Sequence, residues 1–261
     1  MLEVRQTREL GAFPQKNFNC GEPAVITIMD CANACQGVYK NQDIPGFALK
    51  NGFYDPKNTG TYKIFGWSRG AQPGGAVELQ GYSVGYYESL NNPNYCILSV
   101  RGSAKGKMTK DWTDDDIDIG LGRLPDRTND ALSYIERKLA QVKAAYPIIV
   151  GHSLGGFIAQ YCAVRTNTRF ITFNAPPALR AFGGQFPDGR AVGNFRSGLN
   201  YRTKYDPVSK VPGSHVGPLI TLRLGGESKL ASHKMSVVIP CLNHTGIAND
   251  PAFAAIALAN R

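Results

Sequence analysis

The sequence predicts an α/β fold with a mostly parallel central sheet, antiparallel strands at one edge, and crossover helices on both faces. The middle of the chain alternates short apolar runs with helix-like segments, which is typical of parallel strands joined by helices. Two strand-like segments, 62–68 and 77–88, flank a turn-rich connector over 72–75 and predict the antiparallel edge. The chain has 261 residues, of which 43% are hydrophobic, so a single domain over 1–261 is expected.

The individual elements follow from periodicity and from turn residues. Leu132, Ile135 and Leu139 recur at the spacing of one helix face, so a helix is expected there. Residues 1–24 show no regular pattern and are expected to form an irregular N-terminal arm. The expected elements, in chain order, are a helix over 24–40, a loop over 46–60, strands over 62–68, 77–88 and 95–101, a helix over 129–145, a strand over 147–151, a helix from 154, strands over 169–174, 200–205 and 219–224, and a helix over 233–242.

The net charge and the distribution of apolar residues indicate which kinds of partner the protein could bind. The formal net charge is +9, but the basic residues are dispersed and match no nucleic-acid-binding module. An anionic membrane surface is therefore a better partner for this charge than nucleic acid, and an effect on solubility alone remains the alternative. No apolar run is long enough for a transmembrane helix, and the first residues contain no apolar core of a secretory signal. We expect cytoplasmic synthesis, which leaves export by a signal-independent route open.

Cys31, Cys35, Cys96 and Cys162 are expected to be buried thiols rather than metal ligands, and the six cysteines of the chain do not indicate a disulfide framework. Six in a chain of this length are too sparse for a disulfide scaffold, and none has the spacing of a zinc motif. They are Cys20, Cys31, Cys35, Cys96, Cys162 and Cys241. No metal is expected.

A strand-turn-helix segment contains the pattern Gly-x-Ser-x-Gly over residues 151–155. The apolar run 148–150 precedes it, and a helical pattern begins at Leu154. Glycines two residues before and after Ser153 leave room for a turn tight enough to lift the serine hydroxyl above the sheet. The pattern predicts that Ser153 is the nucleophile of an acyl-transferring hydrolase; an ordinary glycine-rich turn is the alternative.

Such a serine needs a histidine base, and the histidine needs an acid that fixes its tautomer. His233 is the preferred base because it lies where a loop meets a helix after the last expected strand; His215 and His244 are the alternatives. Asp206 is the preferred acid because it follows an expected strand and precedes a proline. Three other acids have the surroundings of turn or cap residues or lie less favourably: Asp188, Asp250 and Glu227.

The oxyanion of the reaction needs preorganised hydrogen-bond donors. One donor is expected to be the backbone N–H of Leu154, the residue after the nucleophile. Ser103 is expected to supply the other, because it follows the strand over 95–101 and offers both an N–H and a hydroxyl. This chemistry requires no cofactor, and none is expected.

These segments together resemble the class 3 lipases, the family of fungal triacylglycerol lipases, phospholipases and related esterases. The similarity lies, in order, in Arg-Gly-Ser at 101–103, Asp-Trp-x-x-Asp at 111–115, Gly-His-Ser-Leu-Gly-Gly at 151–156, Thr-Phe-Asn-Ala-Pro at 172–176 (Thr-Phe-Gly-x-Pro in the family), the acid segment 206–212, and His-Val-Gly at 215–217. The resemblance implies an α/β-hydrolase fold and an oxyanion role for Ser103. It favours His233 over His215, because the family's His-x-Gly element does not supply the base.

The resemblance also implies a lid in the segment after Ser103, which here is longer than usual. The candidate lid and interface residues are Lys105, Lys107, Met108, Lys110, Trp112 and Asp115. We hypothesise that the lysines meet anionic phospholipid headgroups while Met108 enters the interface; a solvated charged loop is the alternative. Asp115 is expected to have a structural role, holding either Ser103 or the base of the lid. The family's His-x-Gly-Phe element is replaced at 118–121 by Asp-Ile-Gly-Leu.

The sequence therefore predicts a hydrolase of lipid carboxylic esters, either acylglycerols or phospholipids, acting through a Ser-His-Asp triad and an acyl-enzyme. One alternative keeps the triad and changes the substrate to a soluble ester or a thioester. Another is a non-catalytic lipid- or protein-binding domain on the same scaffold.

Overall fold

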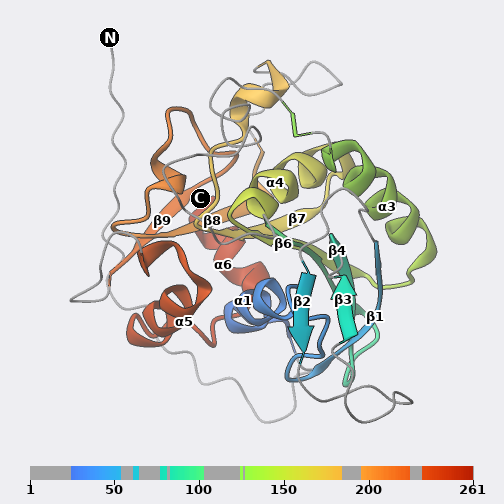
Figure 1. Ribbon diagram of the computed structural model, residues 1–261. Coiled ribbons are helices and arrows are strands. Elements are labelled where there is room, and N and C mark those ends of the chain that lie inside the picture. Colours follow the sequence, from blue (N-terminus) through green and yellow to red (C-terminus); the bar gives the residue numbers. More distant parts are fainter. Residues whose placement is uncertain are drawn as a thin grey trace.

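A seven-stranded mixed sheet crosses the molecule (Figure 1). Its strands in spatial order are β1 (Phe47–Phe53), β4 (Val84–Ser89), β5 (Tyr95–Val100), β6 (Tyr146–His152), β7 (Arg169–Phe173), β8 (Gly198–Thr203) and β9 (Leu219–Leu222). β1, β4 and β5 pair antiparallel, whereas β5 to β9 pair in parallel. This computed structural model describes residues 25–53, 61–64, 77–80, 83–102, 124–125, 127–183, 195–223 and 231–260.

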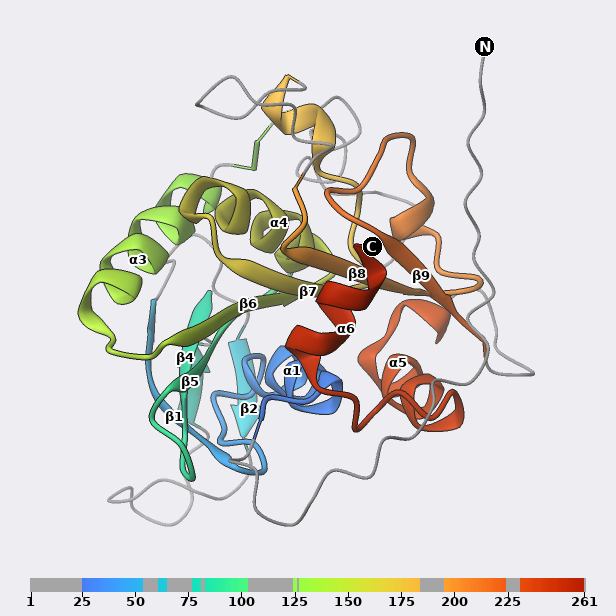
Figure 2. The same ribbon diagram turned by 180° about the vertical axis from the view of Figure 1, so that it is seen from behind.

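Helices cover both faces of the sheet. Figures 1 and 2 view the molecule from opposite sides and show the helices divided between two layers. One layer contains α1 (Ile28–Gly37), α5 (Met235–His244) and α6 (Ala252–Ala259); the other contains α3 (Arg127–Gln141) and α4 (Leu154–Thr166). The expected fold class, an α/β-hydrolase-like arrangement with an antiparallel edge, is confirmed.

The two hydrophobic cores follow from the alternation of side chains along the central strands. In β6, Ile148 and Val150 belong to the core under α1, while Ile149 belongs to the core under α3 and α4. Successive residues of a strand point to opposite faces, so a strand covered on both sides must be apolar throughout. Burial of each such side chain contributes about 1.5–3 kcal/mol. This is why the central strands are continuous apolar runs in the sequence.

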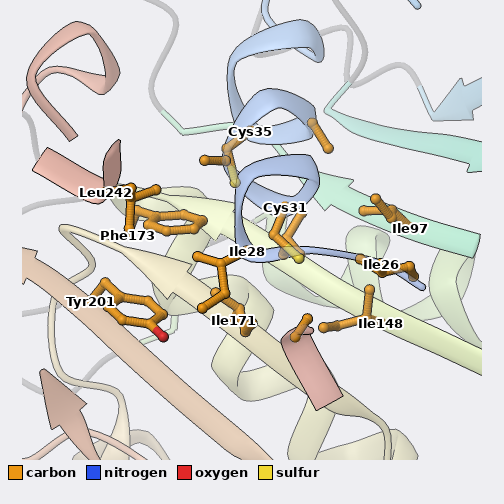
Figure 3. Packing of buried hydrophobic residues seen from close by; sticks show 14 of the residues in the cluster. Ile26, Ile28, Cys31, Cys35, Ile97, Ile148, Ile171, Phe173, Tyr201 and Leu242 are labelled. Atoms are coloured by element: carbon orange, nitrogen blue, oxygen red, sulfur yellow. The ribbon is translucent and has the colours of Figure 1, made fainter. Parts of the chain in front are cut away.

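Helix α1 packs directly over the parallel strands. A capping box begins the helix: the Thr27 hydroxyl accepts a hydrogen bond from the Asp30 N–H (3.1 Å), and the Asp30 carboxylate accepts one from the Thr27 N–H (2.9 Å). In Figure 3, Cys31 lies between the helix and the strands, close to Ile148 and Ile171. The small thiol lets the helix approach the sheet closely.

Two sequence expectations about the antiparallel strands were wrong. The segment 77–88 is not one strand: β3 (Val77–Gln80) pairs with β2 (Thr61–Ile64) in a separate two-stranded sheet, and β4 belongs to the main sheet. The expected loop over 46–60 contains β1, which pairs with β4. β1 includes Lys50, Asn51 and Gly52, which disfavour strands on their own, so here pairing with a neighbour outweighs local propensity. The expected arm over 1–24 lies outside the described residues.

Candidate functional site

The strand-turn-helix segment has the strained backbone that its sequence predicts. β6 ends at His152, α4 begins at Leu154, and Ser153 between them has φ 58° and ψ −135°. A Cβ on Gly155 would collide with the main chain of Val100 and Arg101 in the end of β5. The absence of a side chain at Gly155 therefore permits the close approach of β5 and the first turn of α4.

The structure brings Ser153, His233 and Asp206 together at one edge of the sheet. Ser153 follows β6, Asp206 follows β8, and His233 ends the 3-10 turn η5 (Ala231–His233) beyond β9. The Ser153 hydroxyl donates to Nε2 of His233 at 2.9 Å, and Nδ1–H of His233 donates to Oδ1 of Asp206 at 2.7 Å. The carboxyl ends of parallel strands meet at the same edge of a sheet, which explains this convergence of residues up to 80 positions apart.

Asp206 is fully buried and remains a carboxylate. Burial by itself would raise the pKa of this carboxyl, but the hydrogen bond and charge of His233 and the hydrogen bond from the Ser209 N–H outweigh it, so the pKa lies below its usual value. The backbone N–H of Ser209 donates to Oδ2 at 2.8 Å. The carboxylate is thus held in place from the 3-10 turn η4 (Val208–Lys210) while it faces the imidazole of His233.

A second histidine, His152, lies beside His233, with ring centroids 4.8 Å apart. Burial, followed by the charge of His233, lowers the pKa of His152 to about 3. His152 is therefore neutral near pH 7. Its Nε2 lies 2.7 Å from the carbonyl oxygen of His233, to which it donates its N–H. The Tyr39 hydroxyl lies 3.4 Å from the other ring nitrogen.

Sequence reasoning missed Asn174 and Thr203 as parts of this site. Asn174 is the first residue after β7, has φ 47°, and is fully buried. Its amide Nδ2 donates to the carbonyl oxygens of Ser232 (2.9 Å) and His233 (3.1 Å). The Thr203 hydroxyl also donates to the Ser232 oxygen at 2.7 Å. One signal was present in the sequence: asparagine stands where the resembling motif has glycine.

The other candidate residues fall into two groups. Leu154 is the first residue of α4, so its N–H has no intrahelical acceptor and is available at the turn. Ser103 and the candidate lid residues Lys105, Lys107, Met108, Lys110, Trp112 and Asp115 lie outside the described residues, as do Asp188 and Glu227.

The alternative histidines and the alternative acid that the structure describes lie in other surroundings. His244 is exposed at the end of α5. Burial lowers the pKa of His215 to about 4. The nearby charges of Arg202 and Asp206 have smaller effects on this pKa. Asp250 accepts a hydrogen bond from the Ile28 N–H through its backbone oxygen, near the start of α1. By contrast, the two ring nitrogens of His233 face Asp206 and Ser153.

Two further observations apply to the described part of the chain. Within it, no three His, Cys, Asp or Glu side chains are grouped so that they could hold a metal ion. No helix among these residues combines the length and apolar character needed to cross a membrane.

Comparison with known proteins gives three kinds of result. Solved structures similar to this chain include a triacylglycerol lipase from Penicillium expansum (15% identity, 88% of this chain and 91% of that chain, TM-score 0.42) and a lipase from Rhizopus microsporus var. chinensis (13% identity, 93% and 92%, TM-score 0.41). Lipase II from Rhizopus niveus is similar at 14% identity over 78% of each chain, with a TM-score of 0.42. No curated protein sequence matches. Residues 32–182, more than half of the chain, match the Tle-like phospholipase domain, and the chain therefore belongs to this phospholipase-like family.

Proposed function

We propose that this protein is a serine hydrolase that cleaves carboxylic esters of lipids, with phospholipids as the favoured class. The observation that carries the proposal is the continuous pair of hydrogen bonds from Ser153 to His233 (2.9 Å) and from His233 to Asp206 (2.7 Å). Membership of a phospholipase-like family supports the lipid substrate. The family match covers Ser153, whereas Asp206 and His233 lie beyond it and are supported by this geometry.

The proposed reaction begins with proton transfer from Ser153 Oγ to Nε2 of His233 as Oγ attacks the ester carbonyl carbon. The imidazolium then gives this proton to the oxygen of the departing alcohol as its bond to the acyl carbon breaks, which leaves the acyl group on Ser153. A water molecule next gives a proton to Nε2 and attacks the acyl carbon. The imidazolium passes that proton to Ser153 Oγ as the bond between Oγ and the acyl carbon breaks and the fatty acid leaves. Asp206 stabilises the imidazolium throughout and holds Nδ1 protonated, so that Nε2 is free to accept a proton.

The oxyanion of each tetrahedral intermediate needs donors that are already in place. The N–H of Leu154 at the start of α4 supports one such role, because the first turn of a helix offers unpaired N–H groups and a partial positive charge. Ser103 is proposed as the second donor on its sequence position. Gly102 supports this assignment, since a Cβ on it would lie 3.2 Å from the Cβ of Ser153. The chain just before Ser103 therefore passes close to the nucleophile.

The decisive experiment compares the purified protein with Ser153→Ala on phospholipid vesicles, triacylglycerol emulsions and short nitrophenyl esters. We expect fatty-acid release from lipid esters and a fall in kcat of about 10⁶-fold in the variant. Ser133→Ala is the matched control, because Ser133 is exposed in the middle of α3. A fluorophosphonate probe should label Ser153 in the native protein and in the control.

Each other result selects a different function. Activity on soluble esters without a preference for lipids would favour a soluble-ester esterase. A folded protein that hydrolyses no ester and takes up no probe would refute the proposal and favour a binding domain. Faster hydrolysis of anionic than of neutral vesicles is expected if Lys105, Lys107 and Lys110 contact headgroups; equal rates would contradict that part.

A further inference from the structure

The carbonyl oxygen of His233 accepts hydrogen bonds from two buried side chains that come from two adjacent strand ends. His152, at the end of β6, donates from Nε2 at 2.7 Å, and Asn174, just after β7, donates from Nδ2 at 3.1 Å. The preceding carbonyl, that of Ser232, accepts from Asn174 at 2.9 Å and from Thr203 at 2.7 Å. Two main-chain carbonyls of the turn that presents the base are therefore bonded by side chains from the ends of β6, β7 and β8.

Asn174 can play this part only in one orientation of its amide. Its Oδ1 accepts a hydrogen bond from the Thr203 N–H at 2.8 Å, so Nδ2 must face the two carbonyls of η5. The reversed amide would place an oxygen against two carbonyl oxygens and an NH₂ group against an N–H. Glycine would accept the left-handed φ of 47° as readily as asparagine does, yet would supply none of these bonds. Backbone conformation alone thus does not account for the asparagine.

His152 is held in the matching tautomer. A carbonyl oxygen can only accept, so Nε2 of this neutral imidazole carries the hydrogen and Nδ1 is an acceptor. The Tyr39 hydroxyl, 3.4 Å from Nδ1, can donate to it while its oxygen accepts the Gly102 N–H at 3.0 Å. The hydrogen bonds then run in one direction, from the end of β5 through Tyr39 and His152 to the carbonyl of His233.

We propose that Asn174 and His152 are positioning residues: by fixing the main-chain carbonyl of His233, they keep Nε2 of its imidazole facing Ser153 and Nδ1 facing Asp206. The inference rests on the proposed function, since it assigns these residues to the same site. The imidazole turns about only two side-chain bonds, so a shift of its main chain moves Nε2 directly. A displacement of about 1 Å in such a site can cost on the order of 100-fold in rate.

The test replaces Asn174 by glycine, which tolerates the positive φ of this position and lacks the side-chain amide. Asn174→Gly should lower kcat by about 10- to 100-fold while KM changes by less than about two-fold, because the change acts on the position of the base, through a carbonyl that bonds to His152 and Asn174. Asn167→Gly is the matched control: Asn167 is also an asparagine with positive φ (50°), but it is exposed at the end of α4. We expect native kcat in this control.

A merely structural role must be separated from positioning. Titration of Ser153 with a fluorophosphonate counts the competent sites, and kcat is then expressed per titrated site. Positioning predicts a full count of sites that are labelled slowly and turn over slowly. A reduced count with native turnover at each remaining site would mean that Asn174 supports folding alone, and would overturn the inference.

A second variant protects the test against failure of the first to fold. His152→Phe keeps a buried ring and removes the Nε2 donor, and it should also lower kcat per site, by about 10-fold, with KM little changed. If the native protein is labelled at Ser153 and both variants match it per site, the inference is wrong and the proposed function stands. If the native protein itself is not labelled, the proposed function fails.

Discussion

The ends of β6 and β7 are neighbours in the sheet, yet they are built in opposite ways. Each strand is followed by a non-glycine residue with positive φ, Ser153 (58°) after β6 and Asn174 (47°) after β7. Around Ser153 the construction depends on missing side chains, because a Cβ on Gly151 or Gly155 would strike backbone atoms. Around Asn174 it depends on a side chain that bonds to two other segments.

This difference separates the two tasks of the site. The end of β6 presents a reactive hydroxyl and needs empty space for a strained turn. The end of β7 holds a neighbouring loop and needs donors that satisfy buried carbonyls. The turn that presents the hydroxyl can be predicted from a sequence motif, because its glycines stand at fixed spacing along the chain. The second task joins residues 29 and 59 positions apart and leaves no local pattern.

After loss of the nucleophile itself, the largest effect is expected from the acid that orients the base. Asp206→Asn should lower kcat about 10⁴-fold, because an amide that donates to Nδ1 of His233 stabilises the wrong tautomer. That corresponds to about 5 kcal/mol of transition-state stabilisation. Asp250→Asn is the control for loss of a carboxylate elsewhere. A ratio of kcat values below about ten between native and Asp206→Asn would place the acid on another residue.

A test on the β6 side adds one methyl group where the motif has none. Gly155→Ala places a Cβ against the backbone of Val100 and Arg101 and should destabilise the protein by about 3 kcal/mol, with loss of activity. Urea unfolding and ester hydrolysis measure the two effects.

Gly246→Ala is the matched control for this test. Gly246 has φ 75° and open space around it, so its variant bears conformational strain alone, about 1–2 kcal/mol. Gly155 lies in α4 and has no positive φ, so its variant tests space alone. A loss of stability in Gly155→Ala no larger than that in Gly246→Ala would contradict the steric need for this glycine.

The smallest expected effect is on the pH dependence of stability. It distinguishes the two donors to the His233 carbonyl, because the imidazole of His152 can bind a proton and the amide of Asn174 cannot. The pKa of His152 is lowered to about 3 in the folded protein, against about 6.5 in an unfolded chain. Between these values the unfolded chain binds more protons, so stability rises with pH there. The contribution of His152 is fully present above about pH 6.5 and is lost towards pH 3, at up to about 1.4 kcal/mol per pH unit.

Urea unfolding of the native protein and of His152→Gln at pH 5.5 and 4.5 measures this contribution. The native protein should lose about 1 kcal/mol more than the variant over that interval. Parallel pH profiles would contradict a neutral, buried His152.

The parts of the fold that the sequence predicted are those with short-range patterns. The helix face of Leu132 and Ile135, the apolar run before the turn at Ser153 and the glycine spacing around Ser153 are all set by neighbouring residues. The predictions that Asp206 would follow a strand and that His233 would lie where a loop meets a helix were of the same kind. In the structure Asp206 follows β8, and His233 ends η5 just before α5 rather than opening the helix.

The parts that could not be predicted depend on distant partners. β1 becomes a strand because β4 lies beside it, and β3 separates from β4 because β2 pairs with it instead. Asn174 looks in the sequence like a turn residue, and its role depends on carbonyls that approach only after the chain has folded. The neutral state of His152 likewise results from its burial, which cannot be predicted from the residues next to it in the sequence.

The buried cysteines give the two helical layers separate chemical reporters. Among the described residues, Cys31, Cys35 and Cys241 lie in the core under α1, whereas Cys96 and Cys162 lie in the core under α3 and α4. Burial raises the pKa of the Cys96 thiol to about 12 and that of Cys35 higher still, so the reactive thiolate is scarce in the closed protein. An alkylating reagent reaches each thiol only after the helices that cover it move away from the sheet. The order in which these five sites are modified would therefore reveal which side of the sheet unfolds first, without any added label.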